Sequence, residues 1–256
     1  MTESLKLVLS IVVRNWTVYR KNLIANISPT VADPSLIMLS LGLGLGPYLK
    51  ELDGRSYLAF LAPGLLASTA LFTSFFEASY GFFVRMTFEN VFKAMLTTPI
   101  GPREIVLGEL TWNFLKGAFM AAGVGIFLSF FGLTPGFFSL FFAAIIGGLI
   151  ALPLASIGLL AACKVKNIDQ FQSVYSFLIA PLYFISGTFF PLAGLPNSLQ
   201  NLIQLSPFAH GVSLMQLLFW QEISFRAVVW HGGILLLYSV ALGGLAMGAV
   251  RRKLIS

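Results

Sequence analysis

The sequence predicts an all-α, polytopic membrane protein with six transmembrane helices in a single domain, residues 1–256. Charged residues make up only 10% of the chain and hydrophobic residues 57%, whereas soluble domains carry about 25% charged residues. The mean hydropathy is +0.86. The sequence also contains repeated apolar runs, and their lengths approach the roughly 20 residues that a helix needs to cross a bilayer.

Residues 1–27 predict an amphipathic helix that lies in the membrane surface. Apolar and polar side chains recur on different faces at three- and four-residue steps, with cationic flanks. The apolar stripe consists of Leu5, Val8, Val12, Trp16, Tyr19 and Leu23. The alternative is a helix packed on the protein itself. Lys6 and Arg14 interrupt the apolar core that a cleavable signal peptide requires.

Six apolar runs follow and predict the transmembrane helices. They are residues 34–49, 58–84, 105–131, 140–163, 171–190 and 227–250. The first run is short and rich in glycine, and its start can extend back to Ile27. In the second run, Pro63 and Gly64 predict either a kink or the beginning of the helix.

The distribution of cationic residues predicts that both termini are cytoplasmic. Twelve Lys and Arg residues flank the spans on the side that includes both termini, and three flank them on the other side. The three are Lys50, Arg55 and Arg226. Cationic residues concentrate on the cytoplasmic side of membrane proteins. The net charge of +6 is therefore an orientation signal and does not indicate a nucleic-acid partner.

No Asp, Glu, Lys or Arg occurs between Asp169 and Glu222. The first half of this segment supplies the fifth span. The second half, residues 191–210, cannot be another span, because it contains three prolines and many polar side chains. The predicted orientation puts this return segment on the outer side, where irregular backbone at membrane depth needs cover from protein or from a wet cavity.

The cytoplasmic loop 86–102 predicts one short amphipathic helix, which ends at the prolines and glycine of residues 99–102. On periodicity alone, an ordinary interfacial helix is the simpler interpretation. The other is a surface that receives force from a soluble partner. The segment consists of Glu89, Asn90, Val91, Phe92, Lys93, Ala94, Met95 and Leu96.

Three ionisable residues, Glu77, Glu109 and Lys116, fall inside predicted spans. An unpaired charge at the bilayer centre costs about 2.5–3.5 kcal/mol on insertion scales, so we expect Lys116 to pair with a carboxylate. The group can be a polar contact in a transport path. It can equally be a structural ion pair within the bundle or at a subunit interface, with Glu109 near enough to the surface to snorkel.

The sequence contains no constellation for catalysis, for a cofactor or for a metal. His210 and His231 have no partner at ligand spacing, and the single cysteine, Cys163, excludes an internal disulfide and a Cys-based metal site. A phosphate-binding P-loop follows the pattern G-x-x-x-x-G-K-[ST]. The glycine-rich run 42–47 lacks the lysine and the hydroxyl of that pattern, so we expect no ATP hydrolysis by this chain alone.

Three stretches carry a resemblance to a known family. They are YLAFLAPGL at 57–65, FKAMLTTPI at 92–100 followed by REIVLG at 103–108, and PLYFISGTFFP at 181–191 followed by LP at 195–196 and SPFAH at 206–210. These stretches resemble the membrane subunit of ABC-2 type transporters, especially the branch of nodulation-factor (lipo-oligosaccharide) export permeases. The third stretch is the most specific. With the N-terminal helix and six spans, the resemblance covers essentially the whole chain.

The resemblance implies a permease subunit of an ATP-driven exporter in the bacterial cytoplasmic (inner) membrane. It implies a dimer of this chain working with two cytoplasmic ATPase subunits, which would bind ATP and Mg²⁺. The cargo would be amphipathic: a lipid-linked saccharide, a glycolipid or a hydrophobic drug. Residues 89–96 are similar to the family's coupling helix, which docks on the ATPase.

The return segment 191–210 is similar to the family's re-entrant outer helices between spans five and six. The resemblance implies an outer lid over the exit of a dimeric path. The lid residues are Pro191, Leu195, Pro196 and Pro207. The loop 164–169 is minimal, so coupling is expected to rest on residues 89–96 and the N-terminal helix. Phe92→Asp is then expected to break ATPase assembly while leaving the permease inserted.

Two other functions are compatible with the residues. An ion- or proton-coupled secondary transporter would use Glu77, Glu109 and Lys116 as relay groups, and its energy source would distinguish it from an ATP-driven exporter. An intramembrane enzyme acting on lipids ranks last, because the sequence offers no nucleophile–base pair and no metal ligands.

Overall fold

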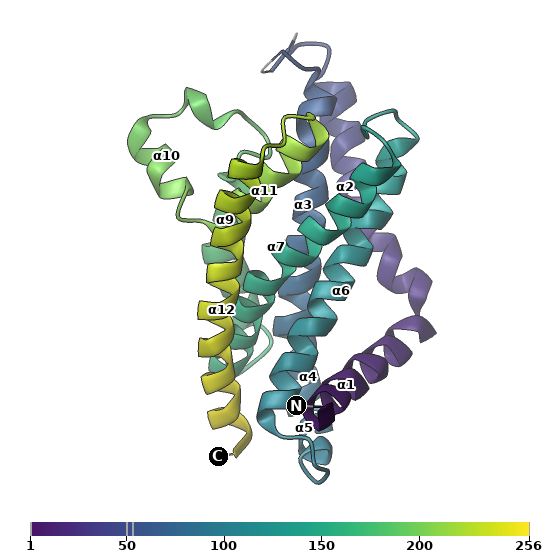
Figure 1. Cartoon of the computed structure of the whole chain (residues 1–256), viewed down its shortest axis with the longest axis vertical. Coiled ribbons are helices and arrows are strands. Elements are labelled where there is room, and N and C mark those ends of the chain that lie inside the picture. Colours follow the sequence, from purple (N-terminus) through teal and green to yellow (C-terminus); the bar gives the residue numbers. More distant parts are fainter. Residues whose placement is uncertain (1, 50, 53, 256) are drawn as a thin grey trace.

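The computed structural model describes residues 2–49, 51–52 and 54–255, and within them the fold is all-helical, as predicted. Long helices run side by side between the two ends of an elongated bundle (Figure 1). The segments are α1 (Thr2–Lys21), α2 (Leu23–Gly44), α3 (Tyr57–Phe76), η1 (Glu77–Gly81), α4 (Phe82–Thr87), α5 (Val91–Met95), α6 (Pro102–Ser129), α7 (Phe137–Lys164), α8 (Gln170–Val174), η2 (Tyr175–Ile179), α9 (Ala180–Phe184), η3 (Leu192–Gly194), α10 (Asn197–Ile203), α11 (Pro207–Phe219) and α12 (Phe225–Ile255).

Four helices are long and apolar enough to cross a membrane, or five if the bent pair α10–α11 counts as one broken span. The four are Tyr57–Thr87, Pro102–Ser129, Phe137–Lys164 and Phe225–Ile255. They correspond to the second, third, fourth and sixth predicted spans. The predicted number of six is not confirmed in the described part of the chain, because the helices at the first and fifth predicted spans do not meet this test of length and composition.

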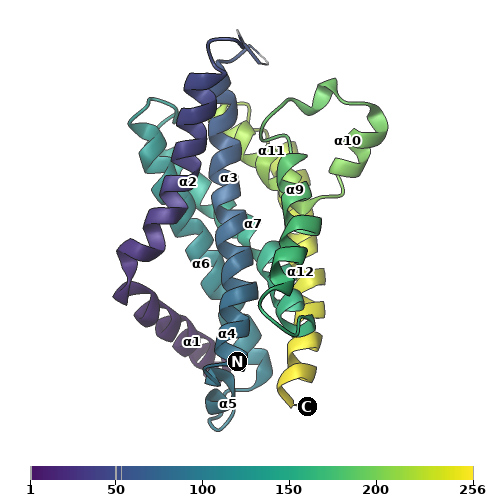
Figure 2. The ribbon, with the colours of Figure 1, turned by 180° about the vertical axis from the view of Figure 1, so that it is seen from behind.

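The first predicted span is displaced toward the N-terminus. α1 ends at Lys21, earlier than residue 27, and α2 begins at Leu23 and ends at Gly44 instead of covering 34–49. Asp33 and two prolines interrupt the apolar pattern in the sequence, which hides the first three turns of this helix. α1 crosses the bundle obliquely and α2 rises beside α3 (Figure 2).

The second span is one continuous helix of 31 residues, Tyr57–Thr87. Ser56 caps it, because its hydroxyl accepts a hydrogen bond from the Ala59 N–H at 3.4 Å. The helix therefore runs through Pro63 and does not begin there. Gly64 permits a close approach, since a Cβ at this position would lie 2.7 Å from Thr188 Cγ2.

α7 lies at the centre of the bundle and packs against α3, α6, α11 and α12. It meets α6 where two glycines face each other. A Cβ on Gly117 would lie 3.0 Å from the Gly147 carbonyl oxygen, and a Cβ on Gly147 would lie 3.0 Å from that of Gly117. Small residues of this kind let two membrane helices approach closely without a hydrophobic driving force.

The fifth predicted span, 171–190, ends early. α8, η2 and α9 form one continuous helix from Gln170 to Phe184, which is shorter than a membrane crossing. Gly187 then turns the chain at φ +86°, a conformation that favours glycine. The Gln216 side chain stabilises this turn by donating to the Gly187 carbonyl at 2.9 Å.

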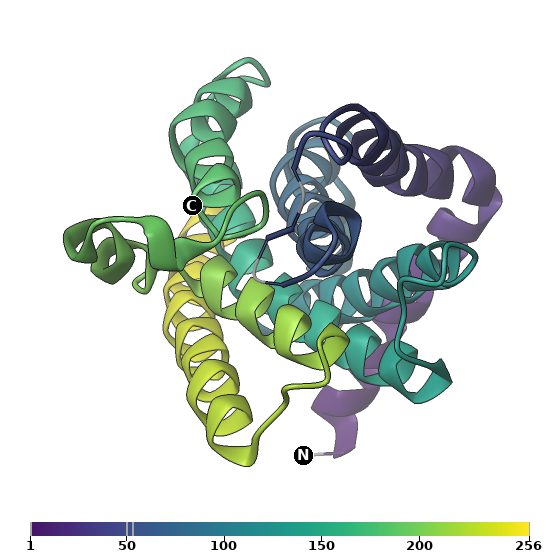
Figure 3. The same cartoon turned by 90° about the horizontal axis from the view of Figure 1, so that it is seen from above.

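The return segment divides into an exposed part and a buried part. α10 carries exposed polar residues and projects away from the bundle (Figure 3). α11 turns back at 94° and is buried against α3, α7 and α12. The segment that enters the bundle is therefore Pro207–Phe219, which begins near the end of the predicted return segment 191–210.

Both termini and α5 lie at one end of the bundle, and α10 lies toward the other (Figure 1). This arrangement agrees with the charge pattern, which puts the termini and the loop 86–102 on one side and the return segment on the opposite side.

Candidate translocation cavity

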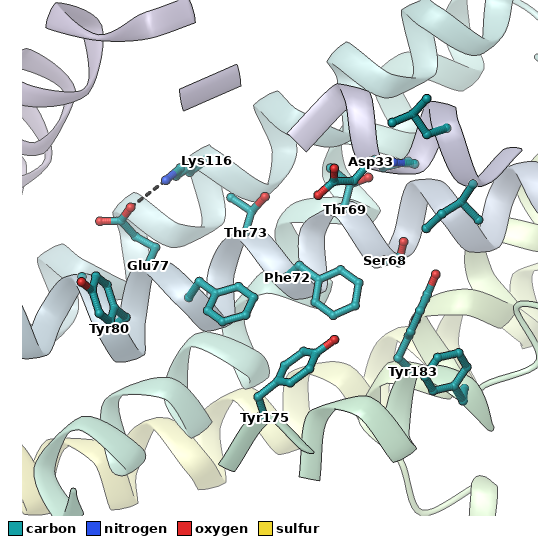
Figure 4. A pocket seen from close by; sticks show the side chains of 16 residues that line it. Asp33, Ser68, Thr69, Phe72, Thr73, Glu77, Tyr80, Lys116, Tyr175 and Tyr183 are labelled. Atoms are coloured by element: carbon teal, nitrogen blue, oxygen red, sulfur yellow. Dashed lines mark hydrogen bonds and ion pairs between the residues drawn. The ribbon is translucent and has the colours of Figure 1, made fainter. Parts of the chain in front are cut away.

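A cavity of about 810 Å³ opens between α2, α3, α6 and the helix Gln170–Phe184. Its walls combine aromatic rings and hydroxyls, with a carboxylate toward one end and an ion pair toward the other (Figure 4). The lining residues labelled in that view are Asp33, Ser68, Thr69, Phe72, Thr73, Glu77, Tyr80, Lys116, Tyr175 and Tyr183. Such a mixed lining suits a ligand that is itself partly polar and partly apolar.

Aromatic rings from two helices meet across the cavity. Phe72 lies edge-on to Tyr183 with ring centroids 5.0 Å apart, and Phe76 stacks on Tyr175 at 5.8 Å. Phe72 and Phe76 belong to α3, whereas the tyrosines belong to η2 and α9. The rings present both faces and edges to a ligand, which is the geometry that aromatic contacts favour.

Four charged residues form an ion-pair network beside the cavity. Lys116 Nζ lies 2.6 Å from Glu77 Oε2, and Arg85 Nη1 lies 2.6 Å from Glu77 Oε1. Arg85 Nη2 lies 2.7 Å from Glu109 Oε2. Asn15 of α1 donates to Glu109 Oε1 at 3.1 Å. Each carboxylate oxygen thus has a donor, and the expected carboxylate partner of Lys116 is Glu77.

The π turn η1 explains how Glu77 reaches Arg85 along its own helix. Residues eight apart in an α-helix differ by about 80° around the axis, whereas residues seven apart nearly coincide. A π turn inserts one extra residue, so Glu77 and Arg85 share a face as if they were seven apart. Gly81 lies beneath the pair, since a Cβ there would be 3.5 Å from both side chains.

The network joins α1 to the spans. Arg14 donates to the Asn15 side chain at 3.0 Å, which connects a third cation to Glu109. Burial, followed in size by the nearby Arg85 cation, lowers the pKa of Arg14. Burial also raises the pKa of Tyr19 to about 12, so its phenol is neutral where its ring faces Lys116 at 4.9 Å.

Sequence reasoning identified Glu77, Glu109 and Lys116 but missed Arg85 and Asn15 as their partners. Arg85 is one of the twelve cationic residues that flank the spans, and at a spacing of eight it lies off the face of Glu77 in a regular helix. The π turn has no recognised sequence signal. Asn15 lies on the face of α1 that packs on α6, so its polarity among buried residues was an available signal.

The predicted coupling segment 89–96 is helical only at Val91–Met95. Phe92 is fully buried and stacks on Phe82 with ring centroids 4.5 Å apart. Lys93 and Ala94 are exposed. Since Phe92 belongs to the protein's own core, its burial argues against the expectation that Phe92→Asp would spare the permease and affect only ATPase assembly. A buried charge there destabilises the fold itself.

The predicted lid residues lie in different environments. Pro196 is exposed, Pro191 and Leu195 are half-buried, and Pro207 is buried at the start of α11. The nearby histidines, which have no partner at ligand spacing in the sequence, meet at 2.7 Å between their Nδ1 atoms, and His210 Nε2 also contacts the Gln204 carbonyl at 2.8 Å. Within the described residues, no group of three or more His, Cys, Asp or Glu side chains could hold a metal ion.

Comparisons with known proteins place the chain in a family. The model of the ABC-2 type transporter family matches residues 6–220. Nodulation protein J of Rhizobium leguminosarum bv. viciae is 32% identical over 242 residues, which cover 94% of this chain and 92% of that protein. Nodulation protein J of Rhizobium meliloti (strain 1021) is 32% identical over 241 residues, covering 94% and 91%. The inner membrane transport permease YadH of Escherichia coli (strain K12) is 26% identical over 185 residues, covering 72% of each chain. The chain therefore belongs to the ABC-2 type transporter family.

Proposed function

We propose that this chain is the membrane-spanning permease subunit of an ATP-driven exporter that moves an amphipathic molecule outward across the bacterial inner membrane. The family match over residues 6–220 carries the proposal. The mixed lining of the cavity supports it, because hydroxyls and aromatic rings stand side by side there. The cargo is a lipid-linked saccharide, a glycolipid or a hydrophobic drug.

The cavity favours the sugar-bearing members of that cargo class. Aromatic faces at Phe76 and Tyr175 offer stacking surfaces, and Ser68, Thr69 and Thr73 offer hydroxyls on the neighbouring wall. Sugar rings have apolar faces and a rim of hydroxyls, so both kinds of group find partners. The Ser68 and Thr69 hydroxyls already donate to the Leu65 carbonyl, so what they can offer a cargo is an acceptor for its hydroxyls, which a purely apolar drug would not use.

Energy enters through two cytoplasmic ATPase subunits, which bind ATP and Mg²⁺ and pair with two copies of this chain. The exposed side of α5 is their docking surface. Force applied there reaches the cavity along one continuous helix, because Phe92 stacks on Phe82 and the same helix carries Glu77. The protein thereby alternates between inward-open and outward-open states, with residues 191–210 as the outer lid.

The first test is reconstitution with an ABC-type ATPase subunit from the same organism. ATP-dependent outward movement of a glycolipid, with ATPase activity that rises in the presence of this chain, is the expected result. ATPase activity that is identical with and without this chain, in lipid and with glycolipid, argues strongly against coupling.

A proton- or ion-driven transporter that uses Glu77, Glu109 and Lys116 as relay groups is distinguished by its energy source. Transport that follows a proton gradient and ignores ATP would favour it. In an ATP-driven exporter, Lys116→Met lowers expression or transport because Glu77 loses a partner. If this variant leaves both unchanged, the pair has no role in either mechanism.

A further inference from the structure

A narrow crease lies between α1 and α6, separate from the main cavity. Its volume is about 380 Å³. Apart from one ammonium group and a phenol, its lining is apolar. The lining residues are Val12, Val13, Trp16, Tyr19, Trp112, Leu115, Lys116 and Phe119. A slot of this size and chemistry fits a flexible hydrocarbon chain.

The crease has a rigid floor and an open mouth. Tyr19 and Trp112 are buried and meet edge-to-face with centroids 5.6 Å apart. Trp16 completes the cluster at 6.4 Å from Trp112, and it is 43% exposed. Val13 is 61% exposed at the mouth. The aromatic floor is thus fixed by packing, while the mouth faces outward from the bundle.

α1 is held firmly enough to form one wall of a site. Ile11 is buried against Gly108, where a Cβ would lie 2.8 Å from the Ile11 side chain. Asn15 is hydrogen-bonded to the buried Glu109. Near its N-terminus, the Ser4 hydroxyl donates to Glu104 at 2.9 Å. These contacts distribute the attachment of α1 along α6.

Lys116 lines both the crease and the main cavity. Its ammonium contacts Glu77 at the cavity and lies over the Tyr19 ring at the crease. A lysine has three donors, so the Lys116 ammonium can keep its contact with Glu77 and still donate to a polar group that passes between the two hollows. The apolar crease and the polar, aromatic cavity therefore meet at one residue.

We infer that the crease holds the hydrocarbon chain of the transported molecule while its polar end enters the cavity past Lys116. The inference rests on the proposed function and assigns α1 a part in the cargo site. Lys116 lies 13 residues after Arg103, or about 20 Å along the helix. The depth of Lys116 distinguishes a transported molecule from an ordinary membrane lipid. A phospholipid in the bilayer keeps its headgroup at the membrane surface, whereas a transported amphipath brings its polar end as deep as Lys116.

A hydrocarbon chain prefers the crease to the surrounding bilayer only modestly. A chain that comes from the bilayer gains no hydrophobic free energy on entering an apolar slot, because lipid tails are as apolar as the slot. The gain comes from packing against the fixed aromatic floor and from positioning the polar end at Lys116. We expect about three- to tenfold effects, comparable to those of a single interhelical hydrogen bond within a membrane.

Photolabelling of the full chain in nanodiscs tests the occupant. The probe is a glucosyl diacylglycerol with a diazirine in one acyl chain, and the matched control is a phosphatidylcholine with the same diazirine. The glucosyl probe is expected to label residues 12–19 and 112–119 about three- to tenfold more than the control at equal mole fraction. Equal labelling by both probes means a resident bilayer lipid only and overturns the inference.

Two substitutions on α1 test the functional consequence. Val13 and Val18 are both exposed, at 61% and 54%, but only Val13 lines the crease. Val13→Phe fills the mouth and is expected to reduce ATP-driven export of the glucosyl lipid about three- to tenfold, while Val18→Phe leaves it unchanged. If the wild-type complex moves no glucosyl lipid with ATP, the glycolipid part of the proposed function fails and the crease inference fails with it. If it does and the two variants behave alike, only the crease inference fails.

Discussion

At the scale of single residues, the ion-pair network is the most constrained part of the molecule. The Glu109 side chain is fully buried, and those of Glu77, Arg85 and Lys116 are 13–16% exposed. Buried ion pairs add little net stability when complete, but the loss of one member leaves an uncompensated charge. The network therefore makes the association of α1, α6 and the second span depend on every one of its charges.

Arg85→Met is expected to lower the free energy of unfolding by about 3–5 kcal/mol, because Glu77 and Glu109 both lose a buried cation. Thermal unfolding of the purified protein in lipid nanodiscs measures the loss. Arg103→Met is the matched control, since Arg103 is exposed at the start of α6. Equal stability of the two variants would show that the network carries no structural weight.

The expected pairing of Lys116 followed from the cost of an isolated charge in a bilayer, which is a general rule that sequence alone can apply. The partner could not be chosen in the same way. Which carboxylate faces Lys116 depends on a π turn in one helix and on the packing of another, and neither is visible in the spacing of the charges.

At the scale of elements, α5 separates into a face used for folding and a face left for a partner. Phe92 packs on Phe82, whereas Lys93 and Ala94 point outward. Phe92→Asp is therefore expected to destabilise the permease, and Lys93→Glu together with Ala94→Glu is expected to weaken ATPase binding without affecting folding. Thermal stability of the permease and co-purification of its ATPase measure the two effects. Normal co-purification of the Lys93 and Ala94 variant would remove α5 as the docking surface.

The contact between α6 and α7 gives a second test at this scale. Gly117→Ala puts a Cβ 2.6 Å from Ala151 Cβ and 3.0 Å from a backbone oxygen, so the helices must separate and the protein loses about 1–3 kcal/mol. Gly123→Ala on the same helix meets nothing within 4 Å, and it gains up to about 1 kcal/mol of helix propensity. Opposite shifts in unfolding temperature are expected. Matching shifts would contradict close packing at Gly117.

Four spans could be read from the sequence because a long apolar run has one favourable structure in a bilayer, and the prolines inside two of them, Pro63 and Pro153, do not end the helix. α2 and the helix Gln170–Phe184 could not. Asp33 breaks the pattern of the first, and a positive φ at Gly187 ends the second before its apolar run is complete. Likewise, α11 enters the bundle because α3, α7 and α12 pack around it, and the local sequence does not encode these long-range contacts.

At the scale of the whole molecule, the two ends of the bundle differ. The termini and α5 lie at one end, and α10 lies toward the other (Figure 1). In intact cells, tags at both termini are therefore expected to resist added protease. A cysteine at exposed position 201 of α10, in a Cys163→Ser background, is expected to react with an impermeant maleimide. Modification of a terminal tag before permeabilisation would reverse the orientation and exclude α5 as an ATPase surface.

The two π turns flank the cavity, Glu77–Gly81 in one wall and Tyr175–Ile179 in the other. Each stores one residue more than a regular turn requires. When such a surplus residue passes along a helix, the stretch it crosses rotates by about 100° while both helix ends keep their places. In the uncharged helix Gln170–Phe184, such a rotation would turn the rings of Tyr175 and Tyr183 toward or away from a cargo, whereas the ion pairs of Glu77 hold the other wall in place.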